Sequence, residues 1–335
     1  MKKILIYDVA AESGGALTVL DKFYAEYCNK EEYECYFVVS VLSYEENDRI
    51  HVIKLPWVKK SWFHRLYCDY VYMKKFIKDN EIDEVLSLQN IGIPNIKIPQ
   101  TVYVHNAIPF TEHKFSLFKE PLLWIYQNII GRLTRKSLKA VDKIIVQTDW
   151  MKKEIEKQCK VQPDRVVVKE VKVEDTVCTE RESTDHTIFF YPTSPIAHKN
   201  NEMIIEACKL LKKCNVSDYE VVLTLSGNEN KLAEKLQKEA SKFDLPIKFV
   251  GRLNKEQMNE FYNKSVLVFP SYLETVGLPL LEAKSFGARI LASDCLYAHC
   301  VLKDYPVCWF DPYDAESISS CMRAEIGSNK IERDD

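Results

Sequence analysis

Short apolar runs recur along the whole chain and are separated by longer segments in which apolar residues have helical spacing. The runs predict buried strands at residues 4–7, 36–41, 52–55, 84–88, 101–104, 143–147, 165–169, 187–191, 220–226, 247–250, 266–269 and 290–292. Continuous apolar strands that alternate with helices are typical of parallel sheets covered on both faces. The pattern therefore predicts an α/β protein in both halves of the chain.

One charged segment with few apolar residues, 172–186, interrupts this alternation. At 335 residues the chain is long for a single hydrophobic core and suits two domains. We predict a first domain of residues 1–175 and a second domain of residues 183–335, joined by this linker.

The stretch from Phe269 to Ser293 is the most informative part of the chain. A strand that ends at Phe269 is followed by a loop and by a helix with Pro279 in its first turn. Gly287 ends the helix, and a second strand follows. In a parallel sheet this unit places the loop at the carboxyl edge, where such sheets bind ligands.

Two carboxylates flank that loop, Glu274 before the helix and Glu282 in its first two turns. Gly277 allows the backbone to come close to a ligand, and the amides of 276–278 lie at the positive end of the helix dipole. Amides suit phosphate oxygens, while carboxylates accept hydrogen bonds from sugar hydroxyls. The arrangement suits a sugar diphosphate, although two glutamates at this spacing also arise by chance in a charged chain.

The longer string PSYLETVGLPLLEAKSFG resembles the E-x7-E motif of the retaining family 4 (group 1) glycosyltransferases, which have the GT-B fold. The matching positions are Pro270, Ser271, Glu274, Gly277, Leu278, Pro279, Glu282, Ala283 and Gly287, with Ser293 and Asp294 after the next strand. The resemblance implies two Rossmann-like domains whose parallel sheets face each other across a cleft. The first domain would receive the acceptor and the second the nucleotide-sugar donor.

The resemblance also implies roles for individual residues. Glu282 would bind ribose hydroxyls, Glu274 the hydroxyls of the donor sugar, and Lys199 the diphosphate, while His105 would reach toward the sugar from the first domain. The implied catalytic residues are Glu274, His105 and Lys199. The implied donor-binding residues are Gly14, Gly15, Lys199, Gly227, Arg252, Glu274, Thr275, Val276, Gly277, Leu278 and Glu282.

Without the resemblance, three of these features have simpler interpretations. Gly14 and Gly15 would form a tight turn that uses the positive φ of glycine. His105 would be a structural histidine at a strand end, and Lys199 a solvated lysine near a helix start.

The chain departs from the family pattern at three places. Asn106 follows His105, where the family often has Asp. Thr193 and Ser194 stand where an Arg commonly precedes the lysine. After a helix predicted at residues 315–325 only a short polar tail follows, whereas the family usually ends with a long crossover helix.

Two stretches of the first half, 57–78 and 110–139, mix aromatic with basic residues. In the first, the pattern fits either an amphipathic helix that packs on a sheet or a surface that meets anionic lipid. In the second, five apolar residues at helical spacing predict a face that packs into the core. These five are Leu122, Tyr126, Ile129, Ile130 and Leu133.

Composition narrows the possible partners. The formal net charge of −3 gives no general attraction to nucleic acid. The amino terminus is too weakly apolar for a signal peptide or a membrane span. The 11 cysteines are scattered, without a C-x-x-C pair, which favours reduced thiols in a cytoplasmic protein. No cofactor or metal is expected, since the sequence has no D-x-D triplet and lysine with a helix terminus can stabilise the leaving diphosphate.

These features lead to one preferred hypothesis and two alternatives. In the preferred hypothesis the protein is a retaining glycosyltransferase that moves a hexose or deoxyhexose from a nucleotide-diphosphate sugar to a glycan hydroxyl. We expect a lipid-linked saccharide as acceptor, in surface polysaccharide biosynthesis, with peripheral contact to an anionic membrane at its inner face. The alternatives are a catalytically inactive partner subunit of an active transferase and a nucleotide-sugar epimerase.

Overall fold

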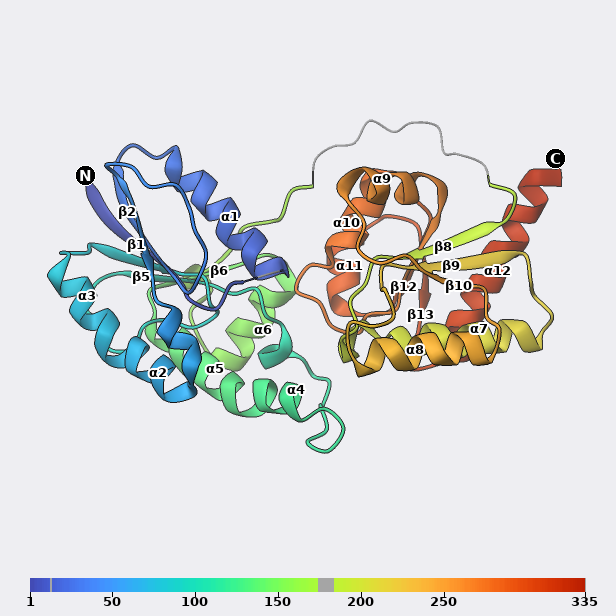
Figure 1. The fold of residues 1–335 in the computed structure, drawn as a ribbon, viewed down its shortest axis with the longest axis horizontal. Helices are drawn as coiled ribbons and strands as arrows, with labels where there is room; N and C mark the ends of the chain where they lie inside the picture. The colour runs from blue at the N-terminus through green and yellow to red at the C-terminus, as the bar shows by residue number, and fades with distance from the viewer. Residues whose placement is uncertain (13, 174–183, 335) are drawn as a thin grey trace. The chain divides into compact units, whose positions relative to one another are not determined.

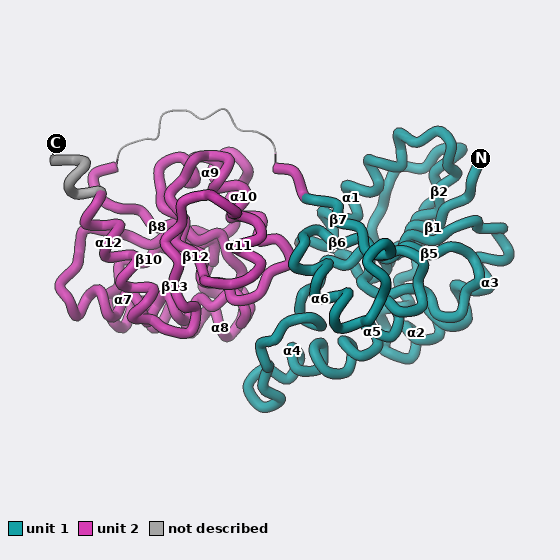
Figure 2. The backbone as a smooth tube through the Cα atoms, turned by 180° about the vertical axis from the view of Figure 1, so that it is seen from behind, with its two compact units in different colours: residues 1–170 teal, residues 171–335 magenta. Residues whose placement is uncertain are grey.

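The computed structural model describes residues 1–12, 14–173 and 184–334. The chain forms two compact units, Met1–Glu170 and Val171–Asp335, shown in Figures 1 and 2. Of the expected linker at 172–186, residues 174–183 lie outside the described residues. Each unit is built around one parallel sheet with helices on both faces.

Unit 1 contains a seven-stranded parallel sheet in the order β3-β2-β1-β4-β5-β6-β7. Its strands are β1 (Lys2–Asp8), β2 (Tyr33–Val39), β3 (Ile50–Lys54), β4 (Glu84–Ser87), β5 (Gln100–Tyr103), β6 (Lys143–Val146) and β7 (Val166–Val168). All seven strands predicted for this half are confirmed, with ends shifted by a few residues. The strand order reverses between β1 and β4, and this switch point is where open parallel sheets bind ligands.

The helices of unit 1 cover both faces of the sheet. The α-helices are α1 (Gly14–Cys28), α2 (Trp62–Tyr67), α3 (Met73–Asp79), α4 (Pro121–Ile125), α5 (Gly131–Ala140) and α6 (Asp149–Cys159). Two π-helical turns, η2 (Cys68–Tyr72) and η4 (Tyr126–Ile130), join α2 to α3 and α4 to α5. The 3-10 turns are η1 (Pro56–Lys60), η3 (Ile108–Phe110) and η5 (Pro163–Arg165).

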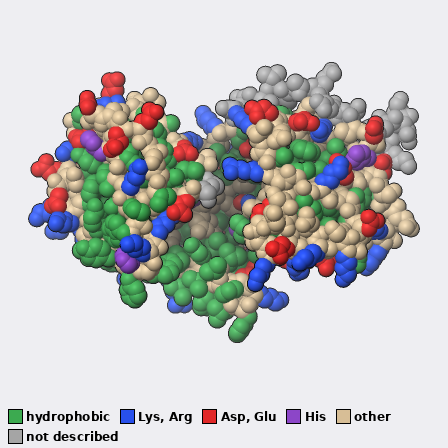
Figure 3. Space-filling model, in the orientation of Figure 1, with side chains coloured by type: hydrophobic (Ala, Val, Ile, Leu, Met, Phe, Trp, Pro, Cys, Tyr) green, Lys and Arg blue, Asp and Glu red, His purple; other side chains and the backbone are tan. Residues whose placement is uncertain are grey.

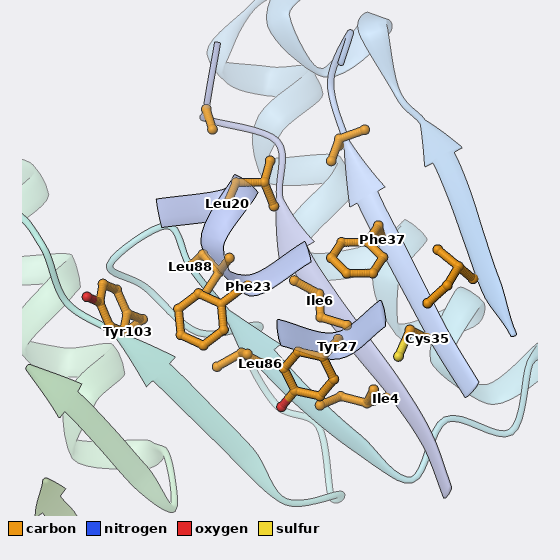
Figure 4. Packing of buried hydrophobic residues seen from close by; sticks show 13 residues of the cluster. Ile4, Ile6, Leu20, Phe23, Tyr27, Cys35, Phe37, Leu86, Leu88 and Tyr103 are labelled. Atoms are coloured by element: carbon orange, nitrogen blue, oxygen red, sulfur yellow. The ribbon is translucent and has the colours of Figure 1, made fainter. Parts of the chain in front are cut away.

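The core of unit 1 has two layers, one on each side of the sheet. On one side Leu20 and Phe23 of α1 pack on Ile6, Phe37 and other strand residues, as Figure 4 shows. On the other side Met73 and its helical neighbours cover the alternate residues of β1 and β2. Buried on both faces, the strands have the continuous apolar sequence from which they were predicted.

Unit 2 contains a six-stranded parallel sheet in the order β10-β9-β8-β11-β12-β13. Its strands are β8 (Thr187–Tyr191), β9 (Tyr219–Leu223), β10 (Ile247–Phe249), β11 (Val266–Phe269), β12 (Ile290–Ser293) and β13 (Val307–Phe310). Its helices are η6 (Ala197–Lys199), α7 (Asn201–Lys213), α8 (Lys231–Lys242), α9 (Lys255–Lys264), α10 (Leu278–Ser285), α11 (Leu296–Leu302) and α12 (Ala315–Asp334). Here the strand order reverses between β8 and β11.

The last helix is longer than predicted. α12 runs from Ala315 to Asp334 rather than stopping at residue 325. Ile318, Met322 and Ile326 recur at four-residue intervals and are buried, and the helix packs on α7. Of these three residues only Ile326 lies beyond residue 325, in a tail that is otherwise mostly polar, so the sequence did not indicate that the helix continues.

One pair of cysteines differs from the expected reduced state. Cys308 in β13 and Cys321 in α12 form a disulfide. Their pairing depends on the packing of a helix against a strand 13 residues earlier, which cysteine spacing alone does not reveal.

The predicted core face of the second basic stretch is wrong. Leu122 is 70% exposed and Ile129 52%, and Tyr126 and Leu133 are exposed as well, whereas Ile130 is half-buried. The inward face carries Gln127, Gly131, Thr134 and Leu138 instead. Gln127 can be buried because its side chain donates to the carbonyl of His113 and accepts from the amide of Phe115.

Candidate active site

The topology of unit 2 brings two predicted site loops together. β8 and β11 are neighbours in the sheet, so the loop after Tyr191 and the loop after Phe269 leave the same carboxyl edge side by side. The first loop carries Lys199 and the second carries Glu274. Lys199 Nζ lies 2.5 Å from Glu274 Oε1, although the two residues are 75 positions apart.

The lysine and the glutamate are held by the same small network. Both side chains are largely buried, with 19% and 14% exposure. Ser271 Oγ donates to the same carboxylate oxygen at 2.8 Å. Oε1 therefore has two donors, and Oε2 remains for another hydrogen-bond donor such as a sugar hydroxyl.

The loop that carries Lys199 is fixed by polar contacts. Asn200 adopts a left-handed conformation with φ of 59°, and its side chain donates to the carbonyls of Pro270 and Pro312. Tyr191 donates its hydroxyl to the carbonyl of Lys199 at 2.6 Å. These contacts fix the lysine backbone, which reduces the entropy lost when the ammonium group binds a ligand.

The amino terminus of α10 forms the backbone part of the site. Gly277 is its N-cap and has φ of 75° and ψ of 62°, a conformation in which glycine is preferred. Among the described residues, the amides of Val276, Gly277 and Leu278 donate no hydrogen bond. Such unpaired amides at a helix start attract anions.

Glu282 lies one turn further along α10. Tyr262, which is buried in α9, donates its hydroxyl to Glu282 Oε2 at 2.6 Å. Burial and the nearby carboxylate hold the pKa of this tyrosine well above its usual range, so it remains a donor. Tyr262 thus fixes one oxygen of Glu282, and the other can accept from a ligand.

Two further predicted contacts follow β9 and β10. Gly227 has φ of 85°, but its amide donates to Glu229 Oε2 at 2.9 Å, and the amide of Ser226 also donates to that carboxylate. These hydrogen bonds lower the pKa of Glu229. Arg252 is exposed and makes no ion pair within the described part of the chain. Thr275 lies in the loop before α10 and is half-buried.

In unit 1, the predicted glycine contacts lie at the start of α1. The prediction of a turn with positive φ is wrong for Gly15, which has helical conformation. Nothing lies within 4 Å of the position that a Cβ of Gly15 would take, so this helix start is open. Gly14 is the first residue of the same helix.

His105 follows β5 and is held in one orientation. Its Nε2 lies 2.9 Å from the carbonyl of Leu88, and because a carbonyl only accepts, Nε2 carries the hydrogen and Nδ1 is unprotonated. Asn90 Oδ1 accepts from the main-chain amide of His105. Burial lowers the pKa of the imidazole, which is therefore neutral at physiological pH.

The family emerges from comparison with known sequences. Residues 14–168 match the model of glycosyltransferase family 4, and residues 179–330 match the model of glycosyl transferases group 1. The two models together account for most of the chain. The protein belongs to the group 1 glycosyltransferases.

Solved structures show that this glycosyltransferase has the GT-B fold. WaaG, a glycosyltransferase involved in lipopolysaccharide biosynthesis, has a TM-score of 0.71 at 16% identity, over 98% of this chain and 90% of that one. Sucrose-phosphate synthase from Thermosynechococcus elongatus has a TM-score of 0.71 at 14% identity, with 98% and 91% covered. HepE of Anabaena with UDP-glucose has a TM-score of 0.66 at 12% identity, with 98% and 91% covered. No curated protein matches the sequence.

The structure adds two candidate site residues of this glycosyltransferase that were not predicted from the sequence. Asp8, at the end of β1, accepts from the amides of Ala10 and Ala11 through Oδ1, while its Oδ2 is buried without a partner. Burial raises the pKa of this carboxyl to about 6. Gln89, just after β4, also has a buried side chain without a partner. Asp8 directly follows a predicted strand, at the switch point of the sheet, a position that could have drawn attention to it.

Within the described residues, no group of three or more His, Cys, Asp or Glu side chains is placed to hold a metal ion. None of the described helices combines the length and the apolar character that crossing a membrane requires.

Proposed function

We propose that this glycosyltransferase moves a hexose or deoxyhexose from a nucleotide-diphosphate sugar to a hydroxyl of a glycan, with retention at the anomeric carbon. The observation that supports this best is the contact of Lys199 with Glu274 beside the unpaired amides of 276–278. A cation and amides suit the diphosphate, and a carboxylate with one free oxygen suits sugar hydroxyls.

The proposal gives each residue the role that the family resemblance implies. Glu282, oriented by Tyr262, binds the ribose hydroxyls. Glu274 binds hydroxyls of the transferred sugar, and Lys199 with the α10 amides stabilises the negative charge that develops on the leaving diphosphate. For His105 the proposal keeps the role on the sugar side that the family resemblance implies. Its unprotonated Nδ1 can accept a hydrogen bond from a hydroxyl.

The reaction proceeds without a metal in this proposal. The lysine ammonium and the helix amides supply the electrostatic stabilisation that a divalent ion provides elsewhere. Added EDTA should leave the rate nearly unchanged. A strict need for manganese would contradict this part of the proposal.

The acceptor in this proposal is a lipid-linked saccharide of surface polysaccharide assembly, met at the inner face of the cell membrane. Exposed apolar side chains on α2 and around α4 support it; Figure 3 shows them gathered on unit 1. They include Phe63, 83% exposed, and Phe118, 95% exposed. WaaG acts in lipopolysaccharide biosynthesis, and HepE was solved with UDP-glucose, which agree with the acceptor and donor classes.

A binding and turnover screen tests the proposal. Native mass spectrometry with a panel of nucleotide sugars should identify one donor that binds, and free nucleotide should appear only when acceptor is added. The anomeric coupling constant in the NMR spectrum of the product should equal that of the donor sugar. Donor binding without any turnover would instead favour an inactive partner subunit, and conversion of the donor without acceptor would favour an epimerase.

A further inference from the structure

A polar cavity of about 340 Å³ lies in unit 1, in the range of small-ligand pockets. It is lined from three directions: by Pro109 in η3, which begins three residues after His105, by the loop residue Lys114, and by Arg135 of α5. Gln127 and Asn128 of the π turn η4 complete one wall. π turns inside helices are frequent at functional sites.

The charge of this cavity is positive. Lys114 and Arg135 are its two ionised lining residues, and no carboxylate lines it. Within the described chain, neither of the two forms an ion pair. Arg135 donates one of its five N–H groups to the carbonyl of Pro109, which anchors the guanidinium and leaves the other donors for a ligand.

The amide side chains of the wall already have hydrogen-bond partners within the protein. Gln127 bonds with His113 and Phe115, and Asn128 donates to the carbonyl of Trp124. The charged groups that this lining offers to a ligand are the two cations. Arginine and lysine together recognise phosphoryl groups, the first through its planar fork and the second as a point charge.

Exposed apolar side chains lie on the same run of helix as three of the cavity-lining residues, Gln127, Asn128 and Arg135. Tyr126 and Ile129, the residues on either side of Gln127 and Asn128, are exposed, as are Leu122 and Leu133 one turn away in each direction. A ligand that joins a phosphoryl group to an apolar chain would engage both features.

We propose that the Lys114–Arg135 cavity binds the phosphoryl group that links the acceptor saccharide to its lipid. The proposal rests on the proposed function only in naming that group as part of the acceptor. It places the lipid chain along the exposed residues of α4 and η4, with the saccharide beginning at η3, close in sequence to His105.

Isothermal titration of the full chain with farnesyl diphosphate, inorganic diphosphate and farnesol tests the proposal. The titrations are made in a Lys199→Gln background, which weakens competing diphosphate binding in unit 2. Farnesyl diphosphate should bind at least tenfold more tightly than either fragment. Lys114→Gln should weaken its binding about tenfold, as expected for one charge-assisted contact. Lys119→Gln is the matched control, an exposed lysine of the same loop outside the cavity, and should change the affinity less than twofold.

Other results overturn the proposal in identifiable ways. Equal affinity for inorganic and farnesyl diphosphate would assign the cavity to a free phosphate ligand rather than a lipid. If Lys114→Gln and Lys119→Gln weakened the binding of farnesyl diphosphate equally, the binding would reflect only a general attraction of the anion to positive charge, not a site in the cavity. Arg135→Lys, which keeps the charge and loses the fork, gives a second measurement and should weaken binding about fivefold or more.

Activity separates this proposal from the function on which it rests. If Lys114→Gln raises the KM for a lipid-linked acceptor and leaves the donor KM unchanged, both stand. If the enzyme transfers sugar normally and Lys114→Gln does not change the rate or the acceptor KM, the assignment of the cavity is wrong but the proposed function stands. If farnesyl diphosphate binds through Lys114 but no donor is turned over, the proposed function fails and the cavity remains.

Discussion

At the scale of single residues, the ion pair between Lys199 and Glu274 decides how the site responds to a donor. The two groups already share a hydrogen bond, so the lysine is held without the loss of rotamer freedom that a long side chain normally suffers on binding. A diphosphate can then share the ammonium group with Glu274, because lysine has three N–H donors.

Lys199→Ala should therefore lower kcat/KM. The expected loss of transition-state stabilisation is about 2 to 4 kcal/mol, on the scale of one preorganised electrostatic partner. The loss should appear mainly in kcat, because charge accumulates on the diphosphate as the glycosidic bond breaks. Steady-state kinetics with a saturating acceptor measures it. Lys209→Ala is the control, since Lys209 is equally buried and ion-paired, but on α7. Activity near that of the wild type would point to Arg252 as the phosphate partner.

Substitutions of Glu274 and Glu282 should affect different kinetic constants. Glu282→Ala should raise the donor KM, because the ribose is remote from the reacting bond and the contact is equal in ground and transition states. Glu274→Ala should mainly lower kcat. Tyr262→Phe, which removes the hydroxyl donor to Glu282, should reproduce a smaller part of the KM effect. An unchanged KM in Glu282→Ala would exclude the ribose role.

Asp8 gives a prediction on pH and stability. Its pKa is raised from 3.8 to about 6, so the folded state holds the proton more tightly than the unfolded state. Stability should therefore fall as pH rises from about 4 to about 6 and then level off, at a cost of about 3 kcal/mol from this group. Asp8→Asn should remove this fall. Urea unfolding at pH 4, 5, 6 and 7 measures it as the difference between variant and wild type, and parallel pH profiles of the two proteins would contradict it.

At the scale of elements, the start of α10 depends on one glycine. A Cβ on Gly277 would lie 3.2 Å from Leu280 Cδ1 and 3.3 Å from the ring of Tyr297, at a positive φ. Gly277→Ala should lower the unfolding free energy by about 1 to 2 kcal/mol and weaken donor binding by moving the amides. Urea unfolding with nucleotide titration measures both. Gly15→Ala, at an open helical position, should be at least as stable as the wild type.

The sequence predicted most elements because strands buried on both faces have continuous apolar runs. β13, Val307–Phe310, was not among the predicted strands, and only its last residue is fully buried. The helical face at Leu122 was misassigned for a different reason. The buried face of this helix carries Gln127, Gly131, Thr134 and Leu138. These residues have the same helical spacing as the apolar residues on the exposed face, and periodicity alone does not say which face is buried.

Within the site, the motif located the loop, but the partners that hold it came from the fold. Glu274 and Glu282 belong to one continuous stretch of sequence. Their partners come from other elements: Tyr262 donates to Glu282, and Asn200 donates to the carbonyl of Pro270 in the loop that carries Glu274. Their contacts depend on the neighbouring positions of β8 and β11 and on helix packing, which local sequence does not encode.

At the scale of the whole molecule, the charge of the basic stretches is smaller than their composition suggests. Arg65 is paired with Asp69 at 2.8 Å, and both are largely buried, where Asp69 also accepts from the hydroxyl of Tyr7. Lys59 is paired with Glu12. Lys60, Lys74, Lys75 and Lys78 form no ion pair with any residue that the structure describes, and they supply the remaining positive charge of the first stretch. Exposed aromatic residues therefore matter as much as charge for any contact with a membrane.

This balance gives the last prediction, on membrane binding. The chain should float with vesicles that contain phosphatidylglycerol, and binding should fall as salt rises, because each basic residue near the surface contributes about 1 kcal/mol that salt screens. Trp62→Ser with Phe63→Ser should reduce binding even at low salt, since aromatic side chains anchor at the interface. Leu296→Ser is the control, an exposed apolar residue of unit 2. Lys60→Gln with Lys75→Gln should weaken the salt-sensitive part, whereas Arg65→Gln should act through folding because its charge is already paired. If vesicle binding did not depend on salt and was unchanged by Trp62→Ser with Phe63→Ser, the exposed aromatic and basic side chains of the first stretch would be assigned to another partner.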